Sequence, residues 1–397
     1  MEDVIIIGGG PVGVINALGL AQAGVRVTVI EAEPEIVSSP RAAVYFWSVL
    51  EGLERLGILE EAEAAGVRKQ DYTYLVRSTG ERIEYSMDVL AGHTPRPYNL
   101  HLSQHRLTGI AMRRLKTCPN ATVRFAARLR TLQQDADGVT LTVETERERE
   151  EMRARWVIGA DGAGSTVRRL LGLSFDGSTW PERFIATNVY YDFERHGYHR
   201  TTFVIDGRCG AVIAVLDNAG LWRCTYMEDA GLPEETFLER LPRAYAAILP
   251  GQGAYQLELA SPYRMHQRSA PRYRVGRVVL AGDAAHDTNP TGALGLTSGL
   301  FDSYALYPAL SAVVLEGADP AVLDRYSAAR REMFLDRVSP QATANKRLVF
   351  HANGGGQGLE EALADLRRLV TDADLLRRRL MFTRSLETAP LLAAPGA

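Results

Sequence analysis

The chain has 397 residues, of which 46% are hydrophobic and 23% are charged, with a formal net charge of -3. This composition is typical of a globular protein of two or three domains, and the small net charge gives no general attraction to nucleic acid or to anionic membranes. Its three cysteines form no CxxC pair and no apolar run reaches the ~18 residues of a membrane span, so we expect a cytoplasmic protein with no metal, nucleic-acid or membrane partner.

The N-terminal segment carries the sequence pattern of a dinucleotide-binding turn. A short β-branched run, suited to a buried parallel strand, precedes glycines in GxGxxG spacing: Gly8, Gly10 and Gly13. These glycines permit a tight turn, close approach of a pyrophosphate to the backbone, and packing of the next helix on the strand. A second strand is expected over 25–30, and Glu31 at its end is placed to accept hydrogen bonds from a ribose. The pattern leaves FAD and NAD open.

The elements that follow are expected from hydrophobic periodicity and turn residues. They are a helix over 41–56, a hairpin over 72–85, a helix over 103–115 with Ser103 as its N-cap, and several strands over 122–157. A sheet is expected over 184–226, a helix over 234–248, and mostly helix after Gly292, with a frayed tail over 389–397.

Two later segments repeat the order of strand, glycine-rich turn and helix. The first is 156–171 and contains "GADGAGSTVR"; the second is 278–299 and contains "GDAAHDTNPTGALGL". With the N-terminus, these segments can share one parallel sheet and converge on one ligand at the carboxyl ends of its strands.

With its three motifs in this order, the sequence resembles the FAD-dependent aromatic hydroxylases of the para-hydroxybenzoate hydroxylase type, from Asp3 to about Arg337. The resemblance implies an α/β fold: a Rossmann-like FAD-binding domain with an inserted mixed β-sheet substrate domain and a helical C-terminal region. We assign residues 1–70, 100–180 and 270–340 to the FAD-binding domain, 71–99 and 181–269 to the substrate domain, and 341–397 to the C-terminal region.

The resemblance also implies the residues that bind the cofactor. Asp283 would accept hydrogen bonds from the ribityl chain, and the backbone around Gly292, Gly295 and Leu296 would approach the isoalloxazine ring. The remaining expected contacts are Gly8, Gly10, Gly13, Glu31, Arg41, Gln104, Asp161 and Gly162. At Thr297 the chain departs from the para-hydroxybenzoate enzyme, which has Asn there.

Four residues are candidates for the catalytic site. Pro290 would border the substrate, with its carbonyl accepting a bond from a phenol hydroxyl or orienting the ring. His286 is either a structural contact of the flavin loop or an acid–base group. Arg223 and Tyr226, on the expected sheet, would face the aromatic ring, with a surface position for Arg223 as the alternative.

The implied activity is monooxygenation of a small, phenol-type aromatic substrate. NADH or NADPH would bind transiently and reduce non-covalently bound FAD, and dioxygen would then give a flavin C4a-hydroperoxide that oxygenates the ring. The alternative is an FAD-dependent oxidoreductase or dehydrogenase of the same fold without oxygen insertion. The family also suggests a homodimer.

Overall fold

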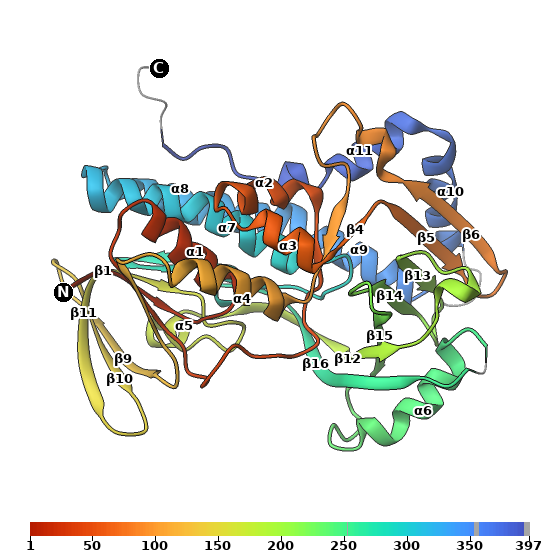
Figure 1. The fold of residues 1–397 in the computed structure, drawn as a ribbon, viewed down its shortest axis with the longest axis horizontal. Coiled ribbons are helices and arrows are strands. Elements are labelled where there is room, and N and C mark those ends of the chain that lie inside the picture. The colour runs from red at the N-terminus through yellow and green to blue at the C-terminus, as the bar shows by residue number, and fades with distance from the viewer. Residues whose placement is uncertain (252, 353–356, 393–397) are drawn as a thin grey trace.

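The structure is a computed structural model that describes residues 1–251, 253–352 and 357–392. Figure 1 shows two halves joined by long strands, with α1 (Pro11–Gln22), α4 (Gln104–Leu115), α7 (Leu294–Ser311) and α8 (Ala321–Met333) in one half. None of the helices in the described residues is long and apolar enough to cross a membrane.

The first sheet forms the half that holds the N-terminus. Its central strands are parallel and almost wholly apolar, as expected of strands buried on both faces. Helix α1 packs against them, between α4 and α7. In spatial order its strands are β17 (Arg274–Val275), β18 (Val278–Leu280), β11 (Arg149–Gly159), β1 (Glu2–Ile7), β2 (Val27–Ile30) and β8 (Ala121–Arg124), with β10 (Val139–Glu144) and β9 (Arg128–Gln134) extending from β11. The short α5 (Thr166–Leu170) follows β11.

The second sheet forms the other half and is mostly antiparallel. Its order is β19 (His286–Asp287), β16 (Gln256–Ser269), β12 (Asp176–Tyr190), β15 (Leu221–Asp229), β14 (Ala211–Val215), β13 (Thr201–Ile205), β5 (Asp71–Val76) and β6 (Glu81–Ser86). The helix α6 (Phe237–Ile248) packs its Leu241, Tyr245 and Ile248 against one face. The domain boundaries given above stay a prediction.

The remaining elements are a three-stranded sheet and the C-terminal helices. The small sheet is β3 (Val44–Tyr45), β7 (Asn99–His101) and β4 (Val67–Lys69), beside α2 (Trp47–Arg55) and α3 (Leu59–Ala65). The C-terminal helices are α9 (Ser339–Phe350), α10 (Gln357–Thr371) and α11 (Ala373–Met381). Within the predicted C-terminal region, 353–356 and 393–397 lie outside the described residues, whereas Leu391 and Leu392, expected to fray, pack against the core.

One local prediction was wrong in its bounds, and another is confirmed only in position. The helix expected over 41–56 begins only at Trp47, because Val44 and Tyr45 pair with β7 and the Asn99 side chain accepts the Trp47 amide at 2.9 Å. Ser103 occupies the N-cap position of α4 but its side chain makes no capping hydrogen bond.

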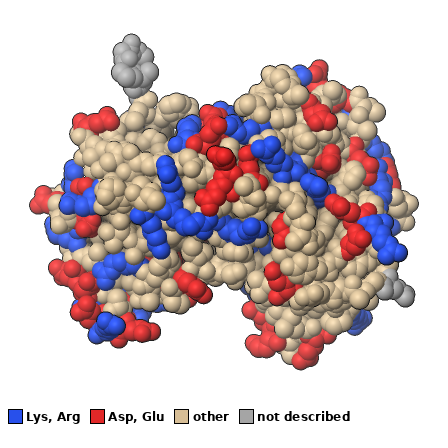
Figure 2. All heavy atoms as spheres, in the orientation of Figure 1, with Lys and Arg blue, Asp and Glu red and all other residues tan. Residues whose placement is uncertain are grey.

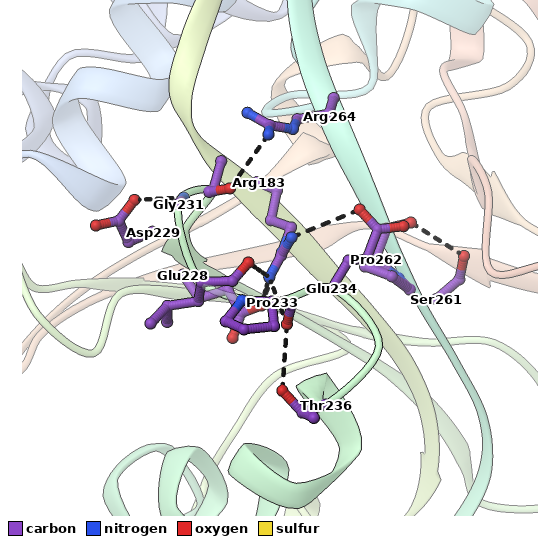
Figure 3. Close-up of polar contacts among 12 residues, drawn as sticks. Arg183, Glu228, Asp229, Gly231, Pro233, Glu234, Thr236, Ser261, Pro262 and Arg264 are labelled. Atoms are coloured by element: carbon purple, nitrogen blue, oxygen red, sulfur yellow. Dashed lines mark hydrogen bonds and ion pairs between the residues drawn. The ribbon is translucent and has the colours of Figure 1, made fainter.

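A buried arginine on β12 fixes the loop that leads into α6. Arg183 is 1% exposed and contacts Glu228 at 2.7 Å, the Leu232 carbonyl at 2.8 Å and Glu234 at 3.5 Å. Figure 3 shows its side chain between Glu228 and Glu234. Because its charge is paired, the side chain is structural, and sequence reasoning had not singled it out.

The face drawn in Figure 2 shows no large region of one charge. In Figure 2, Lys and Arg side chains alternate with Asp and Glu over both lobes of the visible face, which has a constriction between the lobes. This face therefore offers no extended positive track for a polyanion.

Candidate functional site

Three glycine-rich turns meet at one edge of the first sheet. The pairing register places Ile7 beside Gly159 and Gly159 beside Leu280, so the three parallel strands end together. The Ala160 amide donates to the Ile7 carbonyl at 2.8 Å, and the Ala281 amide donates to the Gly159 carbonyl at 3.0 Å. The convergence expected from the sequence is therefore confirmed.

The first turn needs its glycines for two different reasons. Gly8 has φ +111°, and a Cβ on it would lie 2.3 Å from the Ala160 carbonyl oxygen; a Cβ on Gly13 would lie 2.0 Å from the Gly8 oxygen. These two glycines are required by the protein's own packing. A Cβ on Gly10 would meet nothing within 4 Å, so Gly10, at the N-terminus of α1, faces the open space that a pyrophosphate needs.

Glu31 follows β2 and lies against the first turn. Its carboxylate accepts the Gly9 amide at 2.5 Å and the Glu33 amide at 2.9 Å. The side chain is half-buried. It is therefore held beside the glycine turn, in the position from which a carboxylate can accept ribose hydroxyls.

The second turn uses its acidic residue as a helix cap. Asp161 accepts the Ser165 hydroxyl at 2.5 Å and the amides of Thr166 and Val167 at 2.6 and 3.1 Å, so both its oxygens hold the start of α5. Gly162 has φ +77°. A contact of Asp161 or Gly162 with FAD or the nicotinamide stays a prediction.

Arg168 joins the second turn to the third. Its guanidinium donates to the Ala163 carbonyl at 2.6 Å and to the Ala284 carbonyl at 2.8 Å. The side chain lies 3.7 Å from the centroid of Phe175 and is 5% exposed. Arg168 therefore fixes the second and third turns relative to each other.

The acidic residue of the third turn faces open space. Asp283 lies in a single 3-10 turn, Gly282–Ala284, and its side chain is exposed at the edge where the strands end. Although the residue is exposed, the protein atoms around its carboxyl group partly desolvate it and raise the pKa of Asp283, while the charges of His286 and Arg41 oppose that shift. A carboxylate in this setting gains from hydroxyl donors, which a ribityl chain supplies.

His286 points away from that open edge. Its side chain is fully buried, stacks on Phe334 at 4.6 Å between ring centroids, and its Nε2 lies 2.7 Å from Asp302. This placement favours the structural alternative for His286. The acid–base role stays a prediction that the burial does not support.

The loop after His286 leads into α7. The Ala293 amide donates to the Pro290 carbonyl at 3.0 Å, which leaves that oxygen one further lone pair for a ligand. Gly292 has φ +92°, and a Cβ on it would lie 2.3 Å from Nδ2 of Asn345 on α9. Sequence reasoning missed Asn345, since nothing local links position 345 to this loop.

The start of α7 lies beside this loop. A Cβ on Gly295 would meet Thr288 at 3.4 Å, and Leu296 is half-buried. The Thr297 hydroxyl donates to the Ala293 carbonyl at 2.8 Å, inside the helix. The helix N-terminus favours negative charge on a bound ring system.

The backbone of residues 41 and 42 links Gln104 with Arg223 where the two halves of the molecule meet. Arg223 donates from Nε to Asn188 at 2.9 Å and from NH1 to the Arg41 carbonyl at 2.5 Å. The backbone amide of Gln104 donates to the Ala42 carbonyl at 3.1 Å, while the side chain of Arg41 is exposed. Burial lowers the pKa of Arg223 to about 10, so it remains charged at neutral pH.

Tyr226 lies on the opposite face of β15 from Arg223, because the two residues are three positions apart and side chains alternate along a strand. Its ring packs on Tyr245 of α6, at 6.4 Å between centroids, and its hydroxyl has no partner in the described structure. The structure thus separates two residues that were expected to share one site. In the described chain, no group of three or more His, Cys, Asp or Glu side chains is arranged to hold a metal ion.

The residues of the three turns fit FAD: a pyrophosphate space at Gly10, a carboxylate at the ribose position and another at the ribityl position. Fold and site together define an FAD-binding flavoprotein. The family model described as FAD binding domain matches residues 1–339.

Two curated relatives align along almost the whole chain. The chain is 43% identical over 388 residues to 6-hydroxy-3-succinoylpyridine 3-monooxygenase HspB of Pseudomonas putida (strain DSM 28022 / S16), covering 98% of each. It is 40% identical over 401 residues to para-nitrophenol 4-monooxygenase of Pseudomonas sp. (strain WBC-3), covering 98% of this chain and 99% of the relative.

A solved structure gives the same result. The p-nitrophenol 4-monooxygenase PnpA from Pseudomonas putida DLL-E4 superposes with a TM-score of 0.93 at 41% identity, covering 97% of this chain and 98% of that one. The chain belongs to the FAD-dependent aromatic monooxygenases of the para-hydroxybenzoate hydroxylase type.

Proposed function

We propose that this enzyme oxygenates a phenol-type ring at the carbon para to the hydroxyl, where that carbon already carries an electron-withdrawing substituent. The observation that carries the proposal is the ring position in the names of the two relatives. In one, the hydroxyl is at position 6 and both the succinoyl group and the oxygenation are at position 3; in the other, nitro group and oxygenation share position 4.

The reaction balances with one dioxygen and one reduced nicotinamide. When bound, FAD supplies the redox chemistry between NADH or NADPH and dioxygen. One oxygen atom forms a bond to the substituted ring carbon, and the other leaves as water. For a nitro substituent, the carbon–nitrogen bond breaks, nitrite leaves with the bonding electron pair, and the ring leaves as a quinone.

The chain's own residues would bind and orient the ring. Pro290, at the start of the loop that ends at α7, offers a carbonyl lone pair, and Arg223 offers a buried positive charge from the facing sheet. A buried guanidinium favours the phenolate over the phenol, and the phenolate is the more electron-rich ring. The residues around the ring would also have to exclude water from the reacting atoms.

The test compares para-substituted with para-unsubstituted phenols. Purified enzyme with FAD is given NADH or NADPH and either p-nitrophenol or phenol, and nicotinamide oxidation, nitrite and ring product are measured. The proposal requires nitrite and quinone in amounts equal to the nicotinamide consumed. Hydroxylation only at a free ring position, or turnover without any oxygenated product, would overturn it.

The nicotinamide donor, non-covalent attachment of FAD, a homodimer and a cytoplasmic location remain parts of the proposal. Release of FAD by heat denaturation and size-exclusion chromatography of the holoenzyme test two of them directly.

A further inference from the structure

A fully buried ion pair lies behind the cofactor-facing edge. Asp302 on α7 and Arg330 on α8 are both 0% exposed, and Arg330 Nε lies 2.6 Å from Asp302 Oδ1. Removing two charges from water is costly, and a buried pair is weak evidence for stability by itself. Its contacts on either side therefore decide what it does.

On one side, Asp302 holds the third turn. Its Oδ2 accepts the Gly282 amide at 2.9 Å and lies 2.7 Å from His286 Nε2, so one carboxylate oxygen binds residues at both ends of the segment that carries Asp283. Burial alone would raise the pKa of Asp302, but His286 and Arg330 outweigh it and lower the pKa to about 2. The carboxylate is thus charged at neutral pH.

On the other side, Arg330 holds the C-terminal segment and the start of α7. Its NH1 donates to the Leu386 carbonyl at 2.7 Å and to the Thr388 hydroxyl at 2.9 Å. Its NH2 donates to the carbonyl and hydroxyl of Ser298, both at 3.1 Å. Every guanidinium nitrogen therefore has a partner, and movement of residues 386–388 would leave a buried cation without two of its acceptors.

We propose that Asp302 and Arg330 are positioning residues through which the C-terminal segment Leu386–Thr388 fixes the turn that carries Asp283. The contacts run without a break from Thr388 through Arg330 and Asp302 to the Gly282 amide. The turn itself has little freedom to compensate, because Gly282 has φ +61° and a Cβ on it would lie 2.9 Å from Val12. FAD affinity therefore depends on a segment that lies behind the binding edge.

Three variants test this on the folded apoprotein titrated with FAD by flavin fluorescence, well below its melting temperature. Thr388→Val removes one acceptor, and we expect FAD to bind about fivefold more weakly. Thr388→Ser keeps the hydroxyl and should restore binding. Asp302→Asn has one acceptor oxygen where the aspartate has two, and we expect it to bind FAD about tenfold more weakly, or weaker still.

The matched control is Arg325→Met, which removes another hydrogen bond to the tail, the one to the Leu391 carbonyl at 3.2 Å. It should leave the FAD dissociation constant unchanged. If Asp302→Asn does not fold, the comparison of Thr388→Val with Thr388→Ser tests the inference. A Thr388→Val protein that melts earlier but binds FAD as tightly as the parent would show a merely structural role and overturn the inference.

The inference does not depend on the proposed ring position, because FAD binding is measured without turnover. Altered binding in Thr388→Val together with no oxygenated product in the parent would refute the proposed function and leave the inference standing.

Discussion

Arg223→Met should uncouple the enzyme, whereas Tyr226→Phe should leave it unchanged. Both residues lie on β15 and both are less than a tenth exposed, but they project from opposite faces of the sheet. Arg223 binds Asn188 and the backbone of Arg41, at the junction with the cofactor-binding half. Tyr226 packs under α6 with an unpaired hydroxyl. Comparison of the two variants therefore distinguishes the effect of a residue in the site from the effect of changing any buried residue.

The magnitude follows from the two hydrogen bonds of Arg223. Hydrogen bonds to a charged group contribute roughly 1.5–3 kcal/mol each, and leaving a buried acceptor unpaired costs about 1–3 kcal/mol. Methionine fills the aliphatic volume but leaves the Arg41 carbonyl and the Asn188 oxygen unpaired. A displacement of about 1 Å at the reacting atoms can cost on the order of a hundredfold in rate. We therefore expect product per NAD(P)H to fall at least about tenfold, because flavin reduction does not need that placement.

The assay measures oxygenated product, NAD(P)H consumed and hydrogen peroxide released, together with the melting temperature. Tyr226→Phe deletes a hydroxyl that has no partner, so stability and coupling should both match the parent. Equal losses of coupling in the two variants, or a fully coupled Arg223→Met enzyme, would refute the placement of Arg223 in the site.

Three further predictions follow from single residues. Gly10→Ala should leave the melting temperature of the apoprotein unchanged, since its Cβ meets nothing within 4 Å and φ is -72°, yet weaken FAD binding about tenfold or more in a fluorescence titration. His101 is buried, and burial lowers its pKa to about 3, so folding favours the neutral imidazole. The contribution of His101 to the free energy of unfolding is therefore complete above about pH 6.5 and is lost as the pH falls toward 3, at about 1.4 kcal/mol per pH unit. Between pH 7 and 5.5, urea unfolding should show a loss of about 1.3 kcal/mol of unfolding free energy in the parent and a smaller loss in His101→Asn. Pro290→Ala should keep FAD bound but divert NAD(P)H oxidation to peroxide; an unchanged product ratio would remove Pro290 from the site.

The parts of the site that the sequence could predict are local ones. The turn at Gly8 needs a left-handed backbone and close packing, and those demands appear in the sequence as glycines at fixed spacing. The joint ending of β1, β11 and β18 follows from the rule that parallel strands share one carboxyl edge.

The parts that it could not predict depend on tertiary contacts. Strand alternation alone would have placed Arg223 and Tyr226 on opposite faces, once both were assigned to one regular strand. Asn345 against Gly292, and Arg330 against Asp302, join residues 28 or more positions apart through helix packing that no local pattern specifies. The segment 41–46 is not helical, because Val44 and Tyr45 within it pair with β7.

The most direct test of the central claim is the fate of labelled dioxygen. The holoenzyme is supplied with NADH or NADPH, p-nitrophenol and ¹⁸O₂, and the ring product is examined by mass spectrometry. An FAD-dependent aromatic monooxygenase places one labelled atom in the ring product for each nicotinamide oxidised in coupled turnover, and releases the other as water. A ring product without label, or substrate oxidation that continues without dioxygen, would contradict the account.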